Sequence, residues 1–308
     1  SVKDSEEAVN ALRLVLRDLP AEQTEEYVRT LTTEIVSGAI SAEGLLQAWR
    51  GANRVGAAWF QILAGRSALV WPPRLVPDEP AVTAERLLAA GCRLLAQRDV
   101  AVANALLASV TREDDAVLRA AGFAPLASLL YMACEEPAFP QDQPAGRLEF
   151  EPWGADQQDR LIRLVEATYV GTLDCPAMND LRRTEDVLAG YRESGVFSPK
   201  RWLFVRHGDR DAGCLLLSDQ PASGNMELVY TGLVPQSRGR GFGKEICRRA
   251  QWMTRQAGRE RLVTAVDAAN APAIGMYAST GFRAWDRREV YLKHFLAGSD
   301  SSARQDRG

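Results

Sequence analysis

An internal repeat is the sequence feature that most limits how this chain can fold. Three short landmarks occur twice in the same order, and the two copies of each lie 157–159 residues apart. A chain of 308 residues has room for two domains of about 150 residues, an ordinary domain size. The repeat therefore predicts a duplicated domain. The paired landmarks are Val55-Gly56 with Ala212-Gly213, Val76-Pro77 with Val234-Pro235, and Gly122-Phe123 with Gly281-Phe282.

The boundary between the two copies is expected in a proline-rich segment. Residues 137–147 contain three prolines and no helical or strand periodicity, which is typical of a linker. We therefore expect a first domain over 1–136 and a second over 148–297. Residues 298–308 are rich in Ser, Asp, Arg and Gly and are predicted to form a disordered tail.

Apolar periodicity predicts a mixed α/β fold in each half, with helices first, then strands, then alternating helix and strand. In the second half Thr184 precedes Glu185 and Asp186, which predicts that Thr184 caps a helix. In that half, the predicted helices cover 156–169, 184–193, 242–257 and 271–279, and the predicted strands cover 202–206, 213–218, 226–234, 261–266 and 288–295.

The strongest chemical signal is a glycine-rich loop between a strand and an amphipathic helix. Gly239, Gly241 and Gly243 alternate just before or within the first turn of that helix. Glycine lets the backbone approach a ligand without a β-carbon in the way. The first N–H groups of a helix have no partner within it and lie at the positive end of its dipole, so a phosphate is the expected ligand. The cations expected to neutralise it are Arg238, Arg240 and Lys244.

Two common phosphate-loop patterns do not fit this loop. The P-loop requires Ser or Thr after its Gly-Lys pair, where this chain has Glu245. The last glycine of the dinucleotide fingerprint falls on Lys244 or Ile246 in its two possible registers. The pattern Arg-x-x-Gly-x-Gly does fit, over residues 238–243.

The loop Arg238-Gly239-Arg240-Gly241-Phe242-Gly243 resembles the acyl-CoA pyrophosphate loop of the GNAT superfamily of N-acetyltransferases. The run 270–282 resembles a later segment of that family, and the resemblance covers about 148–297. The duplicated chain is similar to the tandem acetyltransferases. The resemblance implies two tandem GNAT-like acyl-CoA N-acyltransferase domains. It also implies a mixed sheet whose fourth and fifth strands splay apart, with acetyl-CoA in the gap.

The resemblance further implies which residues contact acetyl-CoA. Leu233 and Val234 would offer backbone groups to the thioester and pantetheine, and residues 239–244 would hold the pyrophosphate. Asn270 would bond the pantetheine arm, and Tyr277 would lie near the sulfur. The implied set is Leu233, Val234, Arg238, Gly239, Arg240, Gly241, Phe242, Gly243, Lys244, Asn270 and Tyr277.

Acetyl transfer to an amine needs a base for the amine proton and a donor for the departing thiolate. Glu227, eleven residues before Arg238, resembles the family's usual base, and a salt-bridged strand residue is the alternative. Tyr277 is the implied donor, with a core tyrosine as the alternative. Strict alternation would put Glu227, Val229, Thr231 and Leu233 on one face of the strand.

The acceptor amine is expected beside the segment that joins the first two helices of the second half. Tyr169, Thr172 and Asp174 are the candidate contacts there. Asp174 could hold a cationic amine, or it could be a solvated loop residue. Cys175 has no obvious His partner and is not expected to be a nucleophile.

The first half is expected to have lost the chemistry. Shifted by 158 residues, the loop contains no glycine, and Asp78 and Glu79 precede it and would repel a phosphate. We therefore expect that this half does not bind CoA productively. The loop counterparts are Pro80, Ala81, Thr83 and Glu85, and those of Asn270 and Tyr277 are Thr111 and Leu118.

Composition narrows the remaining function classes. A net charge of −3 disfavours a general nucleic-acid binder, and no apolar run is long enough to span a membrane. With two histidines, a three-His metal site is impossible, and no metal is expected. Five widely spaced cysteines favour free thiols in a reducing compartment, the cytoplasm. The oligomeric state stays open, since tandem domains can imitate a dimer within one chain.

The leading hypothesis is an acetyl-CoA-dependent N-acetyltransferase that acts on a small-molecule amine through its C-terminal domain. The alternatives are a non-catalytic acyl-CoA-binding or sensing module, and an acetyltransferase for a protein or peptide amine. Glu227 and Tyr277 favour an enzyme, because a sensor needs neither.

Overall fold

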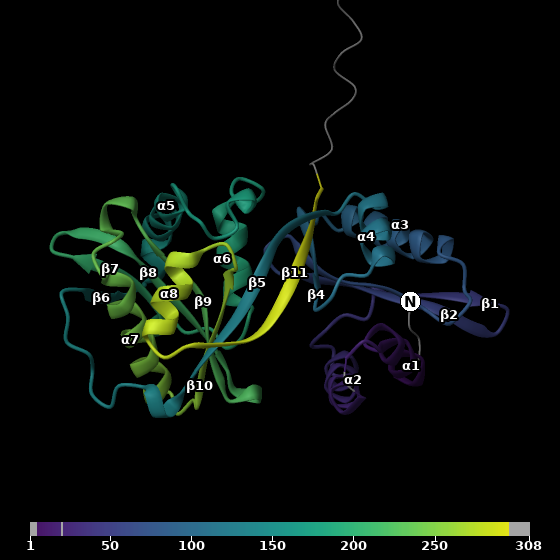
Figure 1. Ribbon diagram of the computed structural model, residues 1–308, viewed down its shortest axis with the longest axis horizontal. Coiled ribbons are helices and arrows are strands. Elements are labelled where there is room, and N and C mark those ends of the chain that lie inside the picture. Colours follow the sequence, from purple (N-terminus) through teal and green to yellow (C-terminus); the bar gives the residue numbers. More distant parts are fainter. Residues whose placement is uncertain (1–4, 20, 296–308) are drawn as a thin grey trace, which may run out of the picture. The chain divides into compact units, whose positions relative to one another are not determined.

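The computed structural model describes residues 5–19 and 21–295 and forms two compact units (Figure 1). The first unit is Ser1–Pro125 together with Val290–Gly308, and the second is Leu126–Glu289. Each unit has its own apolar core. The duplicated organisation expected from the repeat is therefore present as two packed bodies.

Two strands change unit along their length. The unit boundaries fall inside β5 (Ala124–Glu135) and β11 (Arg283–His294). Tyr291, near the end of β11, packs in the core of the first unit, and Met132 of β5 packs in the core of the second. The two sequence repeats and the two compact units are thus different divisions of the chain. The predicted tail at 298–308 lies outside the described residues.

The first unit runs from two helices through three antiparallel strands to alternating helix and strand. Strand β4 then pairs in parallel with β3. The elements are α1 Ser5–Val15, α2 Ala21–Val36, β1 Leu45–Arg50, β2 Asn53–Leu63, β3 Ser67–Leu75, α3 Val82–Gln97, β4 Val102–Leu107 and α4 Arg112–Ala120.

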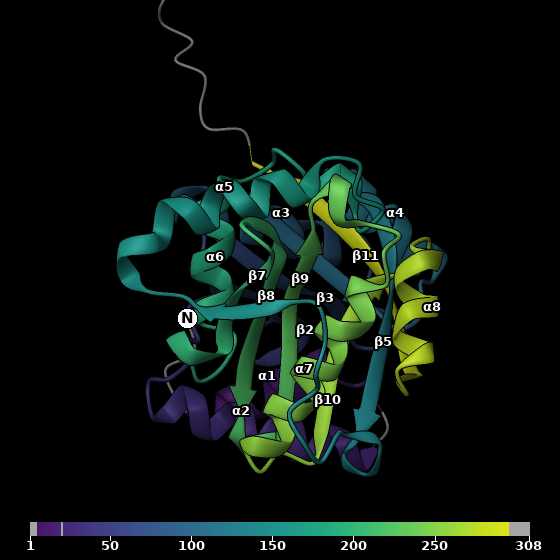
Figure 2. The ribbon, with the colours of Figure 1, turned by 90° about the vertical axis from the view of Figure 1, so that its left-hand side faces the viewer.

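The second unit repeats this order, which confirms the predicted mixed α/β fold. Within it the strands lie in the order β5-β10-β9-β8-β7-β6, and Figure 2 shows β5, β10 and β9 next to one another in this sheet. The elements are β6 Glu149–Pro152, α5 Gln158–Tyr169, α6 Thr184–Arg192, β7 Trp202–His207, β8 Arg210–Gln220, β9 Asn225–Leu233, α7 Phe242–Gln256, β10 Arg261–Asp267 and α8 Ala271–Ser279.

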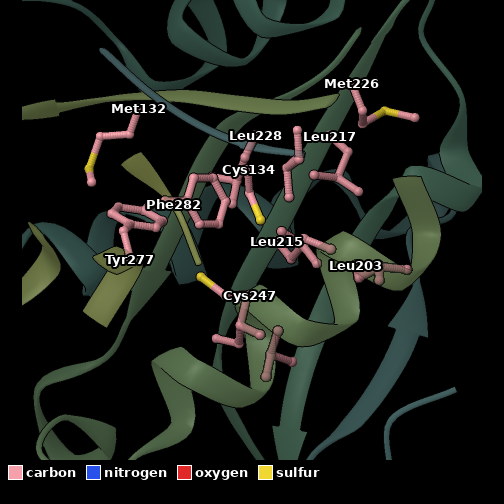
Figure 3. Close-up of a cluster of buried hydrophobic side chains, with 14 of the residues drawn as sticks. Met132, Cys134, Leu203, Leu215, Leu217, Met226, Leu228, Cys247, Tyr277 and Phe282 are labelled. Atoms are coloured by element: carbon pink, nitrogen blue, oxygen red, sulfur yellow. The ribbon is translucent and has the colours of Figure 1, made fainter. Parts of the chain in front are cut away.

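Helices cover both faces of the second sheet. Helices α7 and α8 pack on one face through Phe242, Ile246 and Tyr277, and Figure 3 shows Tyr277 beside Phe282 in this cluster. Helices α5 and α6 pack on the other face through residues such as Leu161 and Leu188. Burial of these apolar stripes holds the sheet between two helical layers.

Strands β9 and β10 run side by side only at their beginnings. Their parallel pairing ends at Val263 opposite Glu227, although β9 continues to Leu233 and β10 to Asp267. Beyond that point β10 keeps its pairing with β5, and β9 keeps its pairing with β8. The sheet therefore opens between β9 and β10, which confirms the splay that the resemblance implied.

A β-bulge interrupts β9 just beyond the opening. Val229 has no partner on β8, because its neighbours Leu228 and Tyr230 pair with consecutive β8 residues. The extra residue breaks the alternation of side chains. Val229 and Tyr230 both pack on the α5 and α6 face, whereas Leu233 packs on the opposite face. The prediction that Glu227, Val229, Thr231 and Leu233 share one face is therefore wrong past Val229, because the bulge shifts the alternation of the residues that follow.

Two element ends also differ from the prediction. The N-cap of α6 is Arg183, and Thr184 is instead a buried helical residue whose hydroxyl donates to the Glu166 carboxylate at 3.0 Å. Strand β11 begins five residues before its predicted start. The charged run 286–289 interrupted the apolar pattern there, but its charges are paired within the strand, as in the ion pair of Asp286 with Arg288.

Candidate active site in the second unit

The glycine loop between β9 and α7 leaves a row of backbone donors unused. Gly239 and Gly241 have φ values of +72° and +82°, a left-handed conformation that side chains with a β-carbon disfavour. In the described part of the chain, the N–H groups of residues 239–243 have no hydrogen-bond acceptor. They lie at the N-terminal end of the 15-residue helix α7. This arrangement suits a phosphate group.

The charges around this loop are arranged for an anion. Arg240 and Lys244 are exposed, and neither has a carboxylate partner among the described residues. Glu245, the acid in the first turn of α7, is held by Arg147, with an Nη2 to Oε1 distance of 2.7 Å and a backbone N–H bond of 2.8 Å. The Arg147 cation compensates the Glu245 charge, which would otherwise repel a phosphate.

Arg147 is a site residue that sequence reasoning missed. It lies in the predicted linker, 98 positions from Glu245. Its guanidinium also donates to the Arg240 carbonyl at 2.8 Å and lies 4.8 Å from the ring centroid of buried Phe242. Only the fold brings these residues together, so no local pattern could have indicated them.

Arg238 uses its side chain differently from the expectation. The guanidinium donates to three carbonyls, those of Thr168 at 2.7 Å, Gly171 at 2.9 Å and Leu233 at 3.0 Å. The guanidinium thereby joins the end of α5 to the end of β9. Its N–H groups are used within the protein and are not directed to a phosphate. Arg240 and Lys244 remain as the free cations of the loop.

Most backbone hydrogen-bonding groups at the end of β9 have partners within the protein. The Val234 N–H donates to the Ala212 carbonyl at 3.0 Å, and the Val234 carbonyl accepts from Ser237 at 2.9 Å. The Leu233 carbonyl is taken by Arg238. The third glycine of the loop has a packing role, since a β-carbon on Gly243 would lie 3.2 Å from Met276 of α8.

Asp174 links the segment between α5 and α6, called the acceptor loop because the acceptor amine is expected beside it, to the end of β10. One of its oxygens accepts the Asp267 N–H at 2.8 Å, and Asp267 in turn accepts the Cys175 N–H at 3.1 Å. Asn270 caps α8 by accepting the Ala273 N–H at 3.3 Å and also bonds Asp174. Burial raises the pKa of Asp174, and these hydrogen bonds oppose the shift. The structure therefore brings Asp174 and Asn270 together beside the β9–β10 opening.

Tyr277 lies in the core next to the same opening. It is 5% exposed, and its ring centroid is 5.1 Å from that of Phe282. Burial raises the pKa of its phenol, and a hydrogen bond with Thr264 of β10 acts in the opposite direction. The phenol is protonated at neutral pH, as at its ordinary pKa of about 10, and the raised pKa makes it a weaker acid than an exposed tyrosine.

Glu227 lies at the point where β9 and β10 part. Its side chain points to the face opposite Met226 and Leu228, which pack under α7. Burial raises the pKa of its carboxyl, against a hydrogen bond of 3.0 Å from Gln220. No arginine or lysine salt bridge holds it among the described residues. A partly buried carboxylate without a cation is suited to accept a proton.

The other predicted acceptor contacts lie on the Glu227 side of the sheet or in its loop. Tyr169 packs edge-on against Tyr230 at 6.1 Å, and burial raises the pKa of Tyr169 to about 12. Thr172 accepts the Asp174 N–H at 3.1 Å within the loop. Burial raises the pKa of the Cys175 thiol to about 12, so it is not a nucleophilic thiolate at neutral pH.

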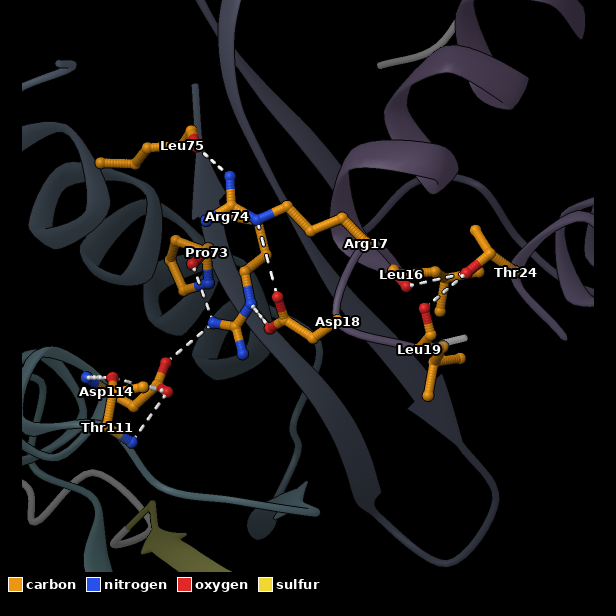
Figure 4. A network of polar contacts seen from close by, with 10 residues as sticks. All are labelled: Leu16, Arg17, Asp18, Leu19, Thr24, Pro73, Arg74, Leu75, Thr111 and Asp114. Atoms are coloured by element: carbon orange, nitrogen blue, oxygen red, sulfur yellow. Dashed lines mark hydrogen bonds and ion pairs between the residues drawn. The ribbon is translucent and has the colours of Figure 1, made fainter. Parts of the chain in front are cut away.

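The corresponding places in the first unit are occupied by its own side chains. Arg74 of β3 lies beyond the last β3–β4 pair and bonds Asp114, in the first turn of α4, at 2.8 Å and also Asp18 (Figure 4). The Glu79 carboxylate lies at the start of α3, where it bonds Thr83 and pairs with Arg50 at 2.8 Å. An ion pair thus joins the end of β3 to the start of α4, and a carboxylate lies near the start of α3.

Comparison with known proteins identifies the second unit. Residues 168–282 match the family model described as Acetyltransferase (GNAT) family. This segment is a GNAT acetyltransferase domain. A mycothiol acetyltransferase of Pseudarthrobacter chlorophenolicus is 28% identical over 121 residues, which are 38% of this chain and 37% of that relative. The match thus spans little more than a third of the relative's length.

Solved structures extend the GNAT likeness over most of the chain. A GCN5-related N-acetyltransferase from Sphaerobacter thermophilus has a TM-score of 0.59 at 16% identity, covering 95% of this chain and 92% of that one. A tandem GNAT protein from the clavulanic acid biosynthesis pathway has a TM-score of 0.51 at 15% identity, covering 95% and 94%. At these identities the likeness concerns the fold, and it supports two tandem GNAT-like domains.

Two further features of the chain concern its surroundings. Over residues 5–19 and 21–295, no helix combines the length and apolarity needed to cross a membrane. All five cysteines are free, and Cys134, Cys214 and Cys247 are buried.

Proposed function

We propose that this protein is an acetyl-CoA-dependent N-acetyltransferase that acetylates the amine of a small molecule and that its second unit carries the reaction. One observation supports this most strongly. The opening between β9 and β10 begins at Glu227, and the strand that forms one side of it leads directly into a loop with free N–H groups. A coenzyme gap, an anion site and a base therefore lie along one strand.

The chain's residues fit acetyl-CoA. The N–H groups of 239–243, with Arg240 and Lys244, would hold the pyrophosphate. Asn270 and the opening past Val263 would take the pantetheine arm. When bound, acetyl-CoA supplies an acyl group activated as a thioester.

Glu227 would act as the base. An amine attacks only after it loses a proton, and the raised pKa of Glu227 makes its carboxylate a better acceptor than an exposed glutamate. Tyr277, whose phenol is protonated at neutral pH, would donate a hydrogen bond, and with it the proton, to the departing thiolate as negative charge builds on the sulfur. Asp174, clasped to Asp267, would position the acceptor loop and not bind the amine itself.

The five free thiols support a reducing compartment such as the cytoplasm for this enzyme. The coenzyme has one binding site per chain in this proposal, because the first unit is filled by Arg74 and Glu79.

Two measurements on the full chain test the proposal. Calorimetry with acetyl-CoA should show one saturable site per chain. Free-thiol release from acetyl-CoA should then depend on added amine across a panel of small amines. No binding heat, or binding with no amine-dependent thiol release from any acceptor, would overturn the proposal.

A further inference from the structure

The second face of β10 is open in the middle of the strand, around Val263 and Ala265, whereas Asp267 at its end is buried. Residues at even positions of β10, such as Leu262 and Val266, pack in the core under α7. The odd positions point to the Glu227 face. There Ala265 is exposed and Val263 is only partly buried, and neither belongs to any apolar cluster of the described residues.

Strand register places this uncovered strip beside Glu227. Val263 is the last β10 residue to pair with β9, and its partner there is Glu227. Ala265 lies two positions further along, where β9 has parted from β10. On the other side Val263 pairs with Ala133 and Ala265 pairs with Tyr131 of β5. With about 4.8 Å between neighbouring strands, Ala133 is about 10 Å from Glu227 on one face.

Aromatic side chains bound the strip on its far side. Tyr131 packs edge-on against Trp285 of β11, with ring centroids 5.9 Å apart. Trp285 is 61% exposed. Burial raises the pKa of Tyr131, whose phenol also feels the charges of Arg288, Glu227 and Asp286. Glu227 and Tyr131 therefore face a common space above Val263 and Ala265.

A pocket continues this space next to Trp285. Its volume of about 490 Å³ lies within the range of about 300–1,000 Å³ that is usual for small-molecule sites. Arg283, which has no ion-pair partner among the described residues, and Arg261, which pairs with Glu135 at 3.0 Å, line it. The net charge of the side chains that line the pocket is therefore positive, which disfavours the binding of a polycation.

We infer that the acceptor amine binds over Val263 and Ala265, with its nitrogen toward Glu227 and a ring of the acceptor against the Trp285 indole. The acceptor class is an amine that carries an aromatic ring or the C–H face of a sugar ring, with a neutral or anionic far end. Both kinds of ring stack on an exposed indole. This inference rests on the proposed acetyltransferase function, and it makes Trp285 and Tyr131 specificity-determining residues.

Steady-state kinetics with three acceptors tests the inference. Tryptamine provides an aromatic ring, glucosamine provides a sugar ring, and spermidine is an acyclic polycation. We expect the ring-bearing acceptors to have the higher kcat/KM in the wild type. Trp285→Ala should raise their KM roughly five- to tenfold, while Trp285→Phe retains most of the affinity for tryptamine. The KM for acetyl-CoA should not change.

Two matched variants make the test specific. Trp49 is also an exposed tryptophan, 46% exposed in the first unit, so Trp49→Ala should leave every KM unchanged. Ala265→Leu adds bulk to an exposed position and should raise the KM of ring-bearing acceptors without loss of thermal stability.

The outcomes separate this inference from the proposed function. A preference for spermidine, or an unchanged acceptor KM in both Trp285→Ala and Ala265→Leu, overturns the acceptor site while the acetyltransferase stands. Binding of acetyl-CoA with no transfer to any amine overturns both.

Discussion

The two units contain the same opening in the sheet, and they differ in what fills it. In the first unit Arg74, on β3 beyond its last pair with β4, forms an ion pair with Asp114 of α4, and the two side chains are only 14% and 11% exposed. The repeat offsets place Gly232 and Ala273 at these positions in the second unit, and neither can form such a bridge. Strand pairing ends early in both units, and the two units differ in the side chains beside that place.

The starts of helices α3 and α7 differ in the same way. Glu79 brings a carboxylate to α3, and the hydrogen bond from Arg50 lowers the pKa of Glu79. At α7 the glycine loop leaves its N–H groups free, with Arg240 and Lys244 beside them. An anion is favourable at a helix N-terminus in either case. The first unit has a carboxylate of its own near its helix start, and the second has exposed cations there.

The largest expected effect on coenzyme affinity comes from closing the loop of the second unit. Gly241 has φ +82°, so Gly241→Val should distort the loop and reduce acetyl-CoA affinity by about a hundredfold or more, because several hydrogen bonds to the phosphates are lost together. Calorimetry measures this. Gly51→Val is the control, since Gly51 also has a positive φ, +59°, with open space around it. Equal loss of affinity in both variants would contradict the role of the loop.

Removing the base should leave the coenzyme site intact. Glu227→Gln is expected to lower kcat by about 10² to 10⁴, the usual contribution of a general base, with little change in acetyl-CoA affinity. Because burial raises the pKa of Glu227, wild-type activity should rise with pH through that raised pKa as the carboxylate forms. The variant should lack this rising limb. A pH–rate profile that is identical in both proteins would exclude Glu227 as the base.

The ion pair that fills the first unit should be structural. Arg74→Ala leaves Asp114 partly buried without its cation and should lower the free energy of unfolding by about 3 kcal/mol. Arg13→Ala breaks an exposed pair with Glu25, 49% and 60% exposed, and should cost less than about 1 kcal/mol. Denaturant titration compares them. Calorimetry of Arg74→Ala should still show one acetyl-CoA site, because Glu79 remains at α3, and a second site would break the comparison between units.

Features of the fold and the site could be predicted from the sequence where one continuous segment contains the whole pattern. The strand–loop–helix unit around Gly241 and the position of Glu227 are local patterns, and in the structure Glu227 lies on β9 with the glycine loop after it. The sequence could not indicate features that depend on partners far along the chain. Arg147 meets Glu245 across 98 positions, and the clasp of Asp174 with Asp267 spans 93. The bulge at Val229 also depends on the register of the neighbouring strand.

The smallest expected effect concerns Arg147, which has no counterpart in any motif. Its ion pair with Glu245 compensates a carboxylate charge close to the proposed phosphate site. Arg147→Ala leaves that charge uncompensated and should weaken acetyl-CoA binding roughly five- to tenfold, as expected for repulsion by one nearby charge. If neutralisation is the cause, adding Glu245→Gln to this variant should restore most of the affinity, and the loss in the single variant should shrink as salt concentration rises. If Arg147 instead supports the loop through the Arg240 carbonyl and Phe242, the double variant should bind no better than Arg147→Ala. Calorimetry on the four proteins of this cycle distinguishes the two roles.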